Sequence, residues 1–68
     1  MDLKHVLATN LRRVRHERNL TQEDVADLTG LSSRYIGSIE RARVSASVTI
    51  LGKLAEALNT EACNLIKS

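Results

Sequence analysis

The sequence predicts an all-α fold, and three observations support this prediction. The composition is rich in Leu and Ala, with three Gly and no Pro among 68 residues, which favours helix over strand. Apolar residues recur at helical spacing, not in alternation. The good N-cap residues Thr21, Ser32 and Ser47 each precede such a segment. We therefore expect one compact five-helix domain over residues 1–68, without a linker or a repeat.

The first helix is expected over roughly Asp2 to Arg18. Its apolar residues recur at helical spacing: Leu3, Leu7, Leu11 and Val14. Asn19 can adopt the left-handed conformation that ends a helix, so the first helix should stop there.

The second helix should open with a capping box formed by Thr21 and Asp24. Its apolar positions are Val25, Ala26 and Leu28. Gly30 should end it, because glycine takes a positive φ at no steric cost and lets the chain turn sharply.

Ser32 is a good N-cap for a third helix that begins at Ser33. Leu31 in the turn and Ile36 and Ile39 in this helix should point into the core. The small Ala26 would let the second and third helices cross closely.

Two more helices are expected after a loop. Ser47 can cap the fourth, whose inward residues should be Val48, Leu51, Leu54, Ala55 and Leu58. A short last helix, roughly Thr60 to Lys67, would contribute Ala62, Leu65 and Ile66.

Several classes of function are disfavoured. The single Cys63 permits no internal disulfide, and His5 and His16 lack partners at metal-ligand spacing, so we expect neither a metal nor another cofactor. No Ser/His/Asp or Cys/His set supports catalysis, and we expect no enzyme activity and no small-molecule substrate. Without a membrane-length apolar run or a signal peptide, a cytoplasmic protein is expected.

The charge pattern suggests a polyanionic partner without establishing one. The net charge is only +2, but arginines gather in two segments: Arg12, Arg13, Arg15 and Arg18, then Arg34, Arg41 and Arg43. Two basic segments could fold onto one face, although such clusters are also common on solvated helix faces.

The stretch "LRRVRHERNLTQEDVADLTGLSSRYIGSIERAR" resembles phage-repressor-like (Cro/Xre-type) helix-turn-helix DNA-binding domains. It has an apolar and basic first helix, Leu-Thr-Gln, the small Ala26, Gly30 and a recognition helix that ends in Ile-Glu. The later "SVTILGKLAEALN" is similar to the fourth helix of the family. The resemblance covers nearly the whole chain and implies a helix-turn-helix at the second and third helices.

The resemblance implies that the third helix enters the major groove of double-stranded DNA. A helical wheel sets Ile36 and Ile39 on one side of it, and Arg34, Gly37, Ser38 and Arg41 on the other. Its N-terminal residues would read bases, with Ser33, Arg34 and Ser38 as the readers. Arg34 is favoured because a guanidinium can make two hydrogen bonds to guanine. Gly37 would allow close approach to DNA, or is merely tolerated.

Other positions would contact phosphates or stabilise the fold. In the family, the residue at Gln22 binds a phosphate. The further phosphate candidates are Thr21, Ser32, Arg41 and Arg43. For Thr21 and Ser32, the alternative is a role as helix caps alone. Arg15 and Glu40 match a structural ion pair of some relatives. In "RARVSASV" the family often has glycine at Ala42 and proline at Ala46, so the path of this loop is open.

The function expected from this resemblance is sequence-specific transcriptional regulation, as a repressor or autoregulator. A homodimer on a palindromic operator is expected, with its dimer surface in the C-terminal part, where Val44, Val48, Leu65 and Ile66 lie; the same residues also suit a monomer that folds its last turn inward. The sequence leaves open a phage-type repressor, a restriction-modification controller or an antitoxin. The alternative is a protein-interaction module, for example in a toxin-antitoxin complex, that keeps the fold without DNA binding as its main role.

Overall fold

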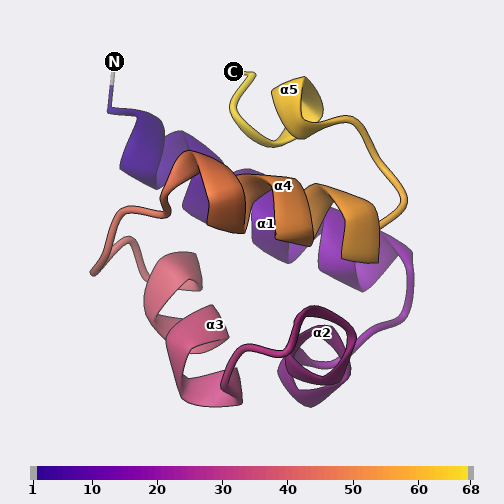
Figure 1. The fold of residues 1–68 in the computed structure, drawn as a ribbon. Helices are drawn as coiled ribbons and strands as arrows, with labels where there is room; N and C mark the ends of the chain where they lie inside the picture. The colour runs from indigo at the N-terminus through magenta and orange to yellow at the C-terminus, as the bar shows by residue number, and fades with distance from the viewer. Residues whose placement is uncertain (1, 68) are drawn as a thin grey trace.

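The computed structural model describes residues 2–67, and every regular element in that range is helical. The helices are α1 (Leu3–Glu17), α2 (Gln22–Thr29), α3 (Ser33–Glu40), α4 (Val48–Ala57) and α5 (Ala62–Leu65). In Figure 1, α2 and α3 lie together on one side of the molecule and α5 lies on the opposite side, with α1 and α4 between them. The all-α, five-helix prediction is confirmed.

Side chains cap the first four helices, as the sequence patterns predict for three of them. The caps Asp2, Thr21, Ser32 and Ser47 accept hydrogen bonds from the backbone N–H groups of Lys4, Asp24, Tyr35 and Ile50, respectively. The capping box of α2 is complete, because the Asp24 carboxylate also accepts from the Thr21 N–H at 2.9 Å. Asp2 is itself a cap, so α1 begins one residue later than predicted.

Left-handed residues separate the helices. Asn19 has a φ of 56° after α1, and Gly30 has a φ of 76° after α2, as their sequence positions predict. Asn59 follows α4 with a φ of 53°. Ala42, in the loop between α3 and α4, also has a positive φ of 56°, although alanine carries a Cβ that disfavours this conformation.

The core draws on all five helices. Its buried members are Leu7, Leu11, Val14, Val25, Ala26, Ile36, Ile39, Leu54, Ala55, Leu58 and Leu65. Leu31, Tyr35 and Val44 pack against this cluster and are partly buried. The apolar face of each helix therefore follows the predicted spacing over most of its length.

Three predicted apolar positions lie outside this core: Leu3 at the start of α1 is 53% exposed, and Val48 and Leu28 are exposed as well. Val48, the first residue of α4, was expected to face inward, but it is 87% exposed. Leu28 on α2 is 59% exposed. Leu51, also expected to face inward, is only half-buried.

The last helix is shorter than the predicted segment from residue 60 to residue 67. It spans Ala62–Leu65, and Glu61 before it makes no side-chain cap. The side-chain amide of Asn10 on α1 donates to the backbone carbonyls of Leu65, at 3.0 Å, and Lys67, at 2.9 Å. These contacts hold the end of the chain against α1 without further helical turns.

Candidate DNA-binding face

The two sides of α3 differ in burial, as the helical wheel predicts. Ile36 and Ile39 are fully buried and fix the helix on the core. Arg34 is exposed, and Ser33 and Ser38 are half-buried. The hydroxyl of Ser32 holds the first turn by accepting from the N–H of Tyr35 at 3.0 Å. The three predicted base-reading residues thus keep solvent access on a helix whose other side is immobilised.

Gly37 differs from the wheel prediction because it is buried. A Cβ built on it would lie 3.2 Å from Nη1 of Arg41 and 3.4 Å from Oε1 of Gln22. The wheel set Gly37 on the open side of α3, but two long side chains cover it. The wheel could not show this, since Gln22 comes from α2.

Gln22 lies where the end of α3 meets the start of α2. Its amide nitrogen donates to Oε1 of Glu40 at 3.1 Å. This bond uses one of its two N–H groups and leaves the other without a bond within residues 2–67. The fold therefore orients the Gln22 amide and brings it together with Gly37 and Arg41.

The ion pair expected between Arg15 and Glu40 is present and is two-pronged. Nε of Arg15 lies 2.6 Å from Oε2 of Glu40, and Nη2 lies 3.0 Å from Oε1. The Arg15 side chain is 11% exposed and that of Glu40 is 3% exposed. The hydrogen bonds to Glu40 raise the pKa of the Arg15 guanidinium above its ordinary value, against the opposing effect of burial. Nη1 of Arg15 also donates to the carbonyl of Leu20 at 2.9 Å.

The remaining phosphate candidates are spread along this side of the protein. The Thr21 and Ser32 hydroxyls act as caps of α2 and α3. Arg41 follows α3 directly, and Arg43 is exposed in the next loop. Ser32 is the N-cap of α3 and Arg41 its C-cap, so phosphate candidates flank both ends of this helix.

Three of the arginines in and directly after α1 have partners within the domain. Arg13 pairs with Glu17 at 3.3 Å, and Arg15 is occupied by Glu40. Nε of Arg18 donates to the carbonyl of Leu58, and its Nη2 donates to that of Asn59 at 3.4 Å, so Arg18 closes the end of α4. Arg13, Arg15 and Arg18 are therefore each engaged within the domain.

Two polar side chains of α1 have contacts that the sequence analysis missed. Nη1 of Arg12 donates to the backbone carbonyl of Glu40 at 3.3 Å, which places it near the end of α3. Asn10 is buried and holds the end of the chain. A sequence signal existed for Asn10, because it lies between Leu7 and Val14 at helical spacing and so falls on the apolar face.

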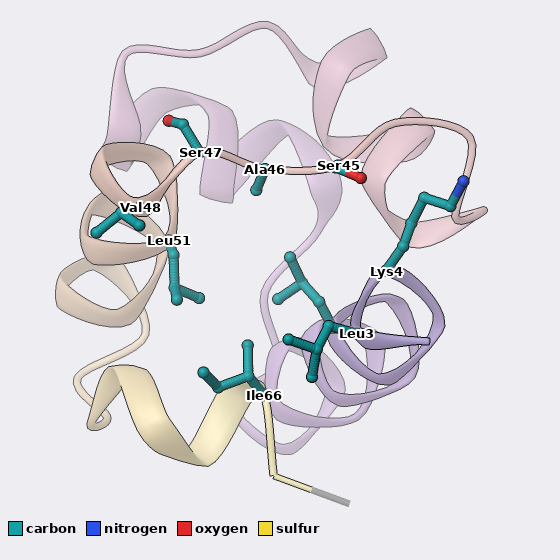
Figure 2. Close-up of a pocket in the computed structure, with 9 residues that line it drawn as sticks. Leu3, Lys4, Ser45, Ala46, Ser47, Val48, Leu51 and Ile66 are labelled. Atoms are coloured by element: carbon teal, nitrogen blue, oxygen red, sulfur yellow. The ribbon is translucent and has the colours of Figure 1, made fainter. Parts of the chain in front are cut away.

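An apolar groove lies beside the loop that follows α3. It is lined by Leu3, Lys4, Leu7, Ser45, Ala46, Ser47, Val48, Leu51 and Ile66. Figure 2 shows Leu3, Leu51 and Ile66 pointing toward one another across it, while Val48 points away at its rim. Leu3 is 53% exposed, so apolar surface continues onto the rim. Leu65 was expected on this surface, but it is fully buried in the core.

The described residues offer no group of three or more His, Cys, Asp or Glu side chains that could hold a metal ion. Within residues 2–67, no helix has the length and apolar character needed to cross a membrane.

The sequence of this chain is similar to those of known helix-turn-helix proteins. Residues 11–64 match the HTH_3 family model, described as helix-turn-helix. The control protein C.SmaI of Serratia marcescens is 44% identical over 66 residues, which cover 97% of this chain and 79% of that protein.

Two solved structures share the whole arrangement of helices. The restriction-modification controller protein C.AhdI of Aeromonas hydrophila superposes with a TM-score of 0.88 at 35% identity, covering 91% of this chain and 94% of its own. The hypothetical transcription factor NHTF of Neisseria superposes with a TM-score of 0.92, also at 35% identity, covering 96% and 75%.

Proposed function

Because this chain belongs to the HTH_3 helix-turn-helix family and is a transcriptional regulator of that fold, we propose that it binds a palindromic operator as a homodimer and represses or autoregulates a promoter. The recognition helix would be α3, with Ser33, Arg34 and Ser38 reading bases in the major groove. Gln22 and Arg41 would bind phosphates, with Thr21, Ser32 and Arg43 as further phosphate contacts.

One observation carries the proposal: α3 is packed against the core on one side and open to solvent on the other. The fully buried Ile36 and Ile39 anchor it, and the exposed Arg34 lies in its first turn. A guanidinium in that position can make two hydrogen bonds to O6 and N7 of a guanine. A protein-interaction module would not need a basic, hydroxyl-bearing front on this helix.

Among the three regulator types that the sequence leaves open, the relatives favour a controller role. C.SmaI is a control protein and C.AhdI is a restriction-modification controller. We therefore propose that this chain regulates the expression of a restriction-modification locus.

The apolar groove supports the homodimer. A two-fold interface must be self-complementary, so one patch has to offer both a projection and a recess. The groove is such a recess, and the exposed Val48 at its rim is such a projection. We propose that a second copy of this chain covers the groove, with Val48 of each protomer against the groove of its partner.

The experiment that tests this function has two steps. First, the protein selects duplexes from a random pool, and the enriched sites are aligned. Second, affinity for an enriched duplex and for a scrambled duplex is measured at several salt concentrations. We expect a palindromic consensus, tighter binding to it, and affinity that falls steeply with salt. If no duplex is bound even at low salt, the protein is an interaction module instead.

A further inference from the structure

Gly37 lies inside the recognition helix, where a glycine costs helix stability relative to alanine. The protein has a second glycine inside a helix, Gly52 in α4, and the two differ in surroundings. A Cβ at Gly52 would meet nothing within 4 Å, whereas a Cβ at Gly37 would meet three side-chain atoms within 3.6 Å. The absence of a Cβ at Gly37 is therefore used by its neighbours.

Those neighbours are the guanidinium of Arg41 and the amide oxygen of Gln22. Nη1 and Nη2 of Arg41 lie 3.2 Å and 3.6 Å from the position of the missing Cβ, and Oε1 of Gln22 lies 3.4 Å from it. Arg41, the C-cap of α3, thus folds back over the residue four positions before it. Both side chains therefore pack over the Cα of Gly37.

The charge around Gln22 explains why a cation is needed there. Glu23 and Asp24 occupy the first turn of α2, directly after Gln22. Both carboxylates would repel a phosphate approaching the Gln22 amide. The Arg41 guanidinium lies over Gly37 beside that amide and supplies the opposite charge.

We infer that Gly37 is a positioning residue, whose missing side chain lets Arg41 fold back beside Gln22 so that both side chains bind one DNA phosphate. The inference rests on the proposed DNA-binding function. It replaces the expectation that Gly37 lets the helix backbone approach DNA, because the covering side chains lie between Gly37 and the solvent. An alanine at position 37 would push the flexible end of Arg41 aside by a few tenths of an ångström and leave the α3 backbone in place.

A double-mutant cycle tests this inference. The variants are Gly37→Ala, Arg41→Ala and the double variant, with Gly52→Ala as the matched helix-glycine control. Arg41→Ala should weaken binding about tenfold per protomer on specific and scrambled duplexes alike. Gly37→Ala should weaken binding by a smaller factor, because the guanidinium is moved but not removed, and the double variant should weaken it by no more than Arg41→Ala alone. Gly52→Ala should bind like the wild type.

The salt dependence of DNA affinity and the urea midpoint together show whether Gly37→Ala changes the position of Arg41 or destabilises the fold. The slope of log affinity against log salt should fall by about one per protomer in Arg41→Ala, which loses one cationic phosphate contact, and by less in Gly37→Ala, which keeps the charge but moves it. The urea midpoint of Gly37→Ala should equal or exceed that of the wild type, since alanine favours helix. A lower midpoint would contradict the inference, because Arg41 would then not yield to the new methyl group.

Two further results would overturn it. If Gly37→Ala weakens binding equally with and without Arg41, Gly37 meets DNA directly; if Gly37→Ala leaves affinity and salt slope unchanged, Gly37 positions nothing. A wild-type protein that binds no duplex would overturn the proposed function as well, whereas a failed cycle in a protein that binds overturns the inference alone.

Discussion

Glu40 joins three helices through one carboxylate. It belongs to α3, pairs with Arg15 of α1 and accepts from the amide of Gln22 of α2. A carboxylate this deeply buried is tolerated because its oxygens receive charged and neutral donors. The same side chain that holds α1 on α3 therefore also orients a proposed phosphate contact.

Replacing Arg15 by alanine should destabilise the protein strongly. The substitution leaves the Glu40 carboxylate buried without its cation, which can cost about 3 to 5 kcal/mol of unfolding free energy. Arg12→Ala is the control, because Arg12 is exposed and donates only one long bond, of 3.3 Å, to a backbone carbonyl. Urea denaturation of both variants measures the difference, and similar midpoints would show that the pair contributes little.

Replacing Arg34 by alanine should relax base preference at one position in each half-site. Loss of a two-bond guanine contact should cost about 1 to 3 kcal/mol of discrimination there. Site selection with the variant measures this. Equal weakening on all sequences would assign Arg34 to a phosphate instead.

Gln22→Ala provides the contrast to Arg34→Ala. It should weaken binding about uniformly across sequences, because a phosphate contact carries no base information. A shift in the preferred sequence would show that Gln22 reads a base.

At the level of helices, local signals predicted most of the boundaries. The capping box at Thr21, the N-caps Ser32 and Ser47, and the left-handed Asn19 and Gly30 each act on a few neighbouring residues, so the sequence displays them directly. The predicted length of α5 was wrong, because Asn10, a residue distant in the sequence, holds the carbonyls of Leu65 and Lys67 by hydrogen bonds. Contacts of this kind are absent from a local pattern.

The candidate site shows the same limit. The wheel of α3 separated the buried Ile36 and Ile39 from the exposed Arg34, because burial repeats with the helix period. It failed at Gly37, which a residue of another helix covers. Spacing predicts which side a residue is on, but not which neighbour crosses over it.

The loop between α3 and α4 offers a test of backbone strain. Ala42 has a φ of 56°, where a Cβ costs roughly 1 to 2 kcal/mol. Ala42→Gly should remove this strain and raise stability by about 0.5 to 1 kcal/mol, after the greater flexibility of glycine in the unfolded chain is offset. Thermal or urea unfolding measures the change.

Gly30→Ala is the matched opposite of that substitution. Gly30 has a φ of 76°, and a Cβ there meets nothing within 4 Å, so a loss of about 1 to 2 kcal/mol would come from the backbone alone. Destabilisation by both substitutions would contradict a strained Ala42.

At the scale of the whole molecule, size limits what one copy can read. The domain measures 30 × 21 × 20 Å and presents three proposed base readers on α3. Half-sites on one face of DNA repeat about every 34 Å, a distance that two touching copies of this size can span. The apolar groove borders the loop after α3, so the proposed contact between copies involves the segment that directly follows the recognition helix.

The dimer therefore predicts a specific effect of Val48→Asp. A carboxylate at this rim position would face the largely apolar groove of the partner, where burial would cost it most of its hydration. The wild type should sediment at twice its mass of 7.5 kDa, and Val48→Asp at the mass of one chain. Leu28→Asp is the matched control, because Leu28 is also an exposed apolar residue but does not line the groove, and this variant should remain dimeric.

DNA binding gives the decisive comparison for the same variants. Wild-type protein should bind a full palindrome much more tightly than a single half-site, because the second copy gains from the contact between protomers. Val48→Asp should lose this advantage and keep the half-site affinity, since Val48 lies outside the proposed DNA contacts. One wild-type protein per full site, bound no more tightly than to a half-site, would rule out the two-fold dimer and leave a monomeric reader whose groove is not a protomer contact.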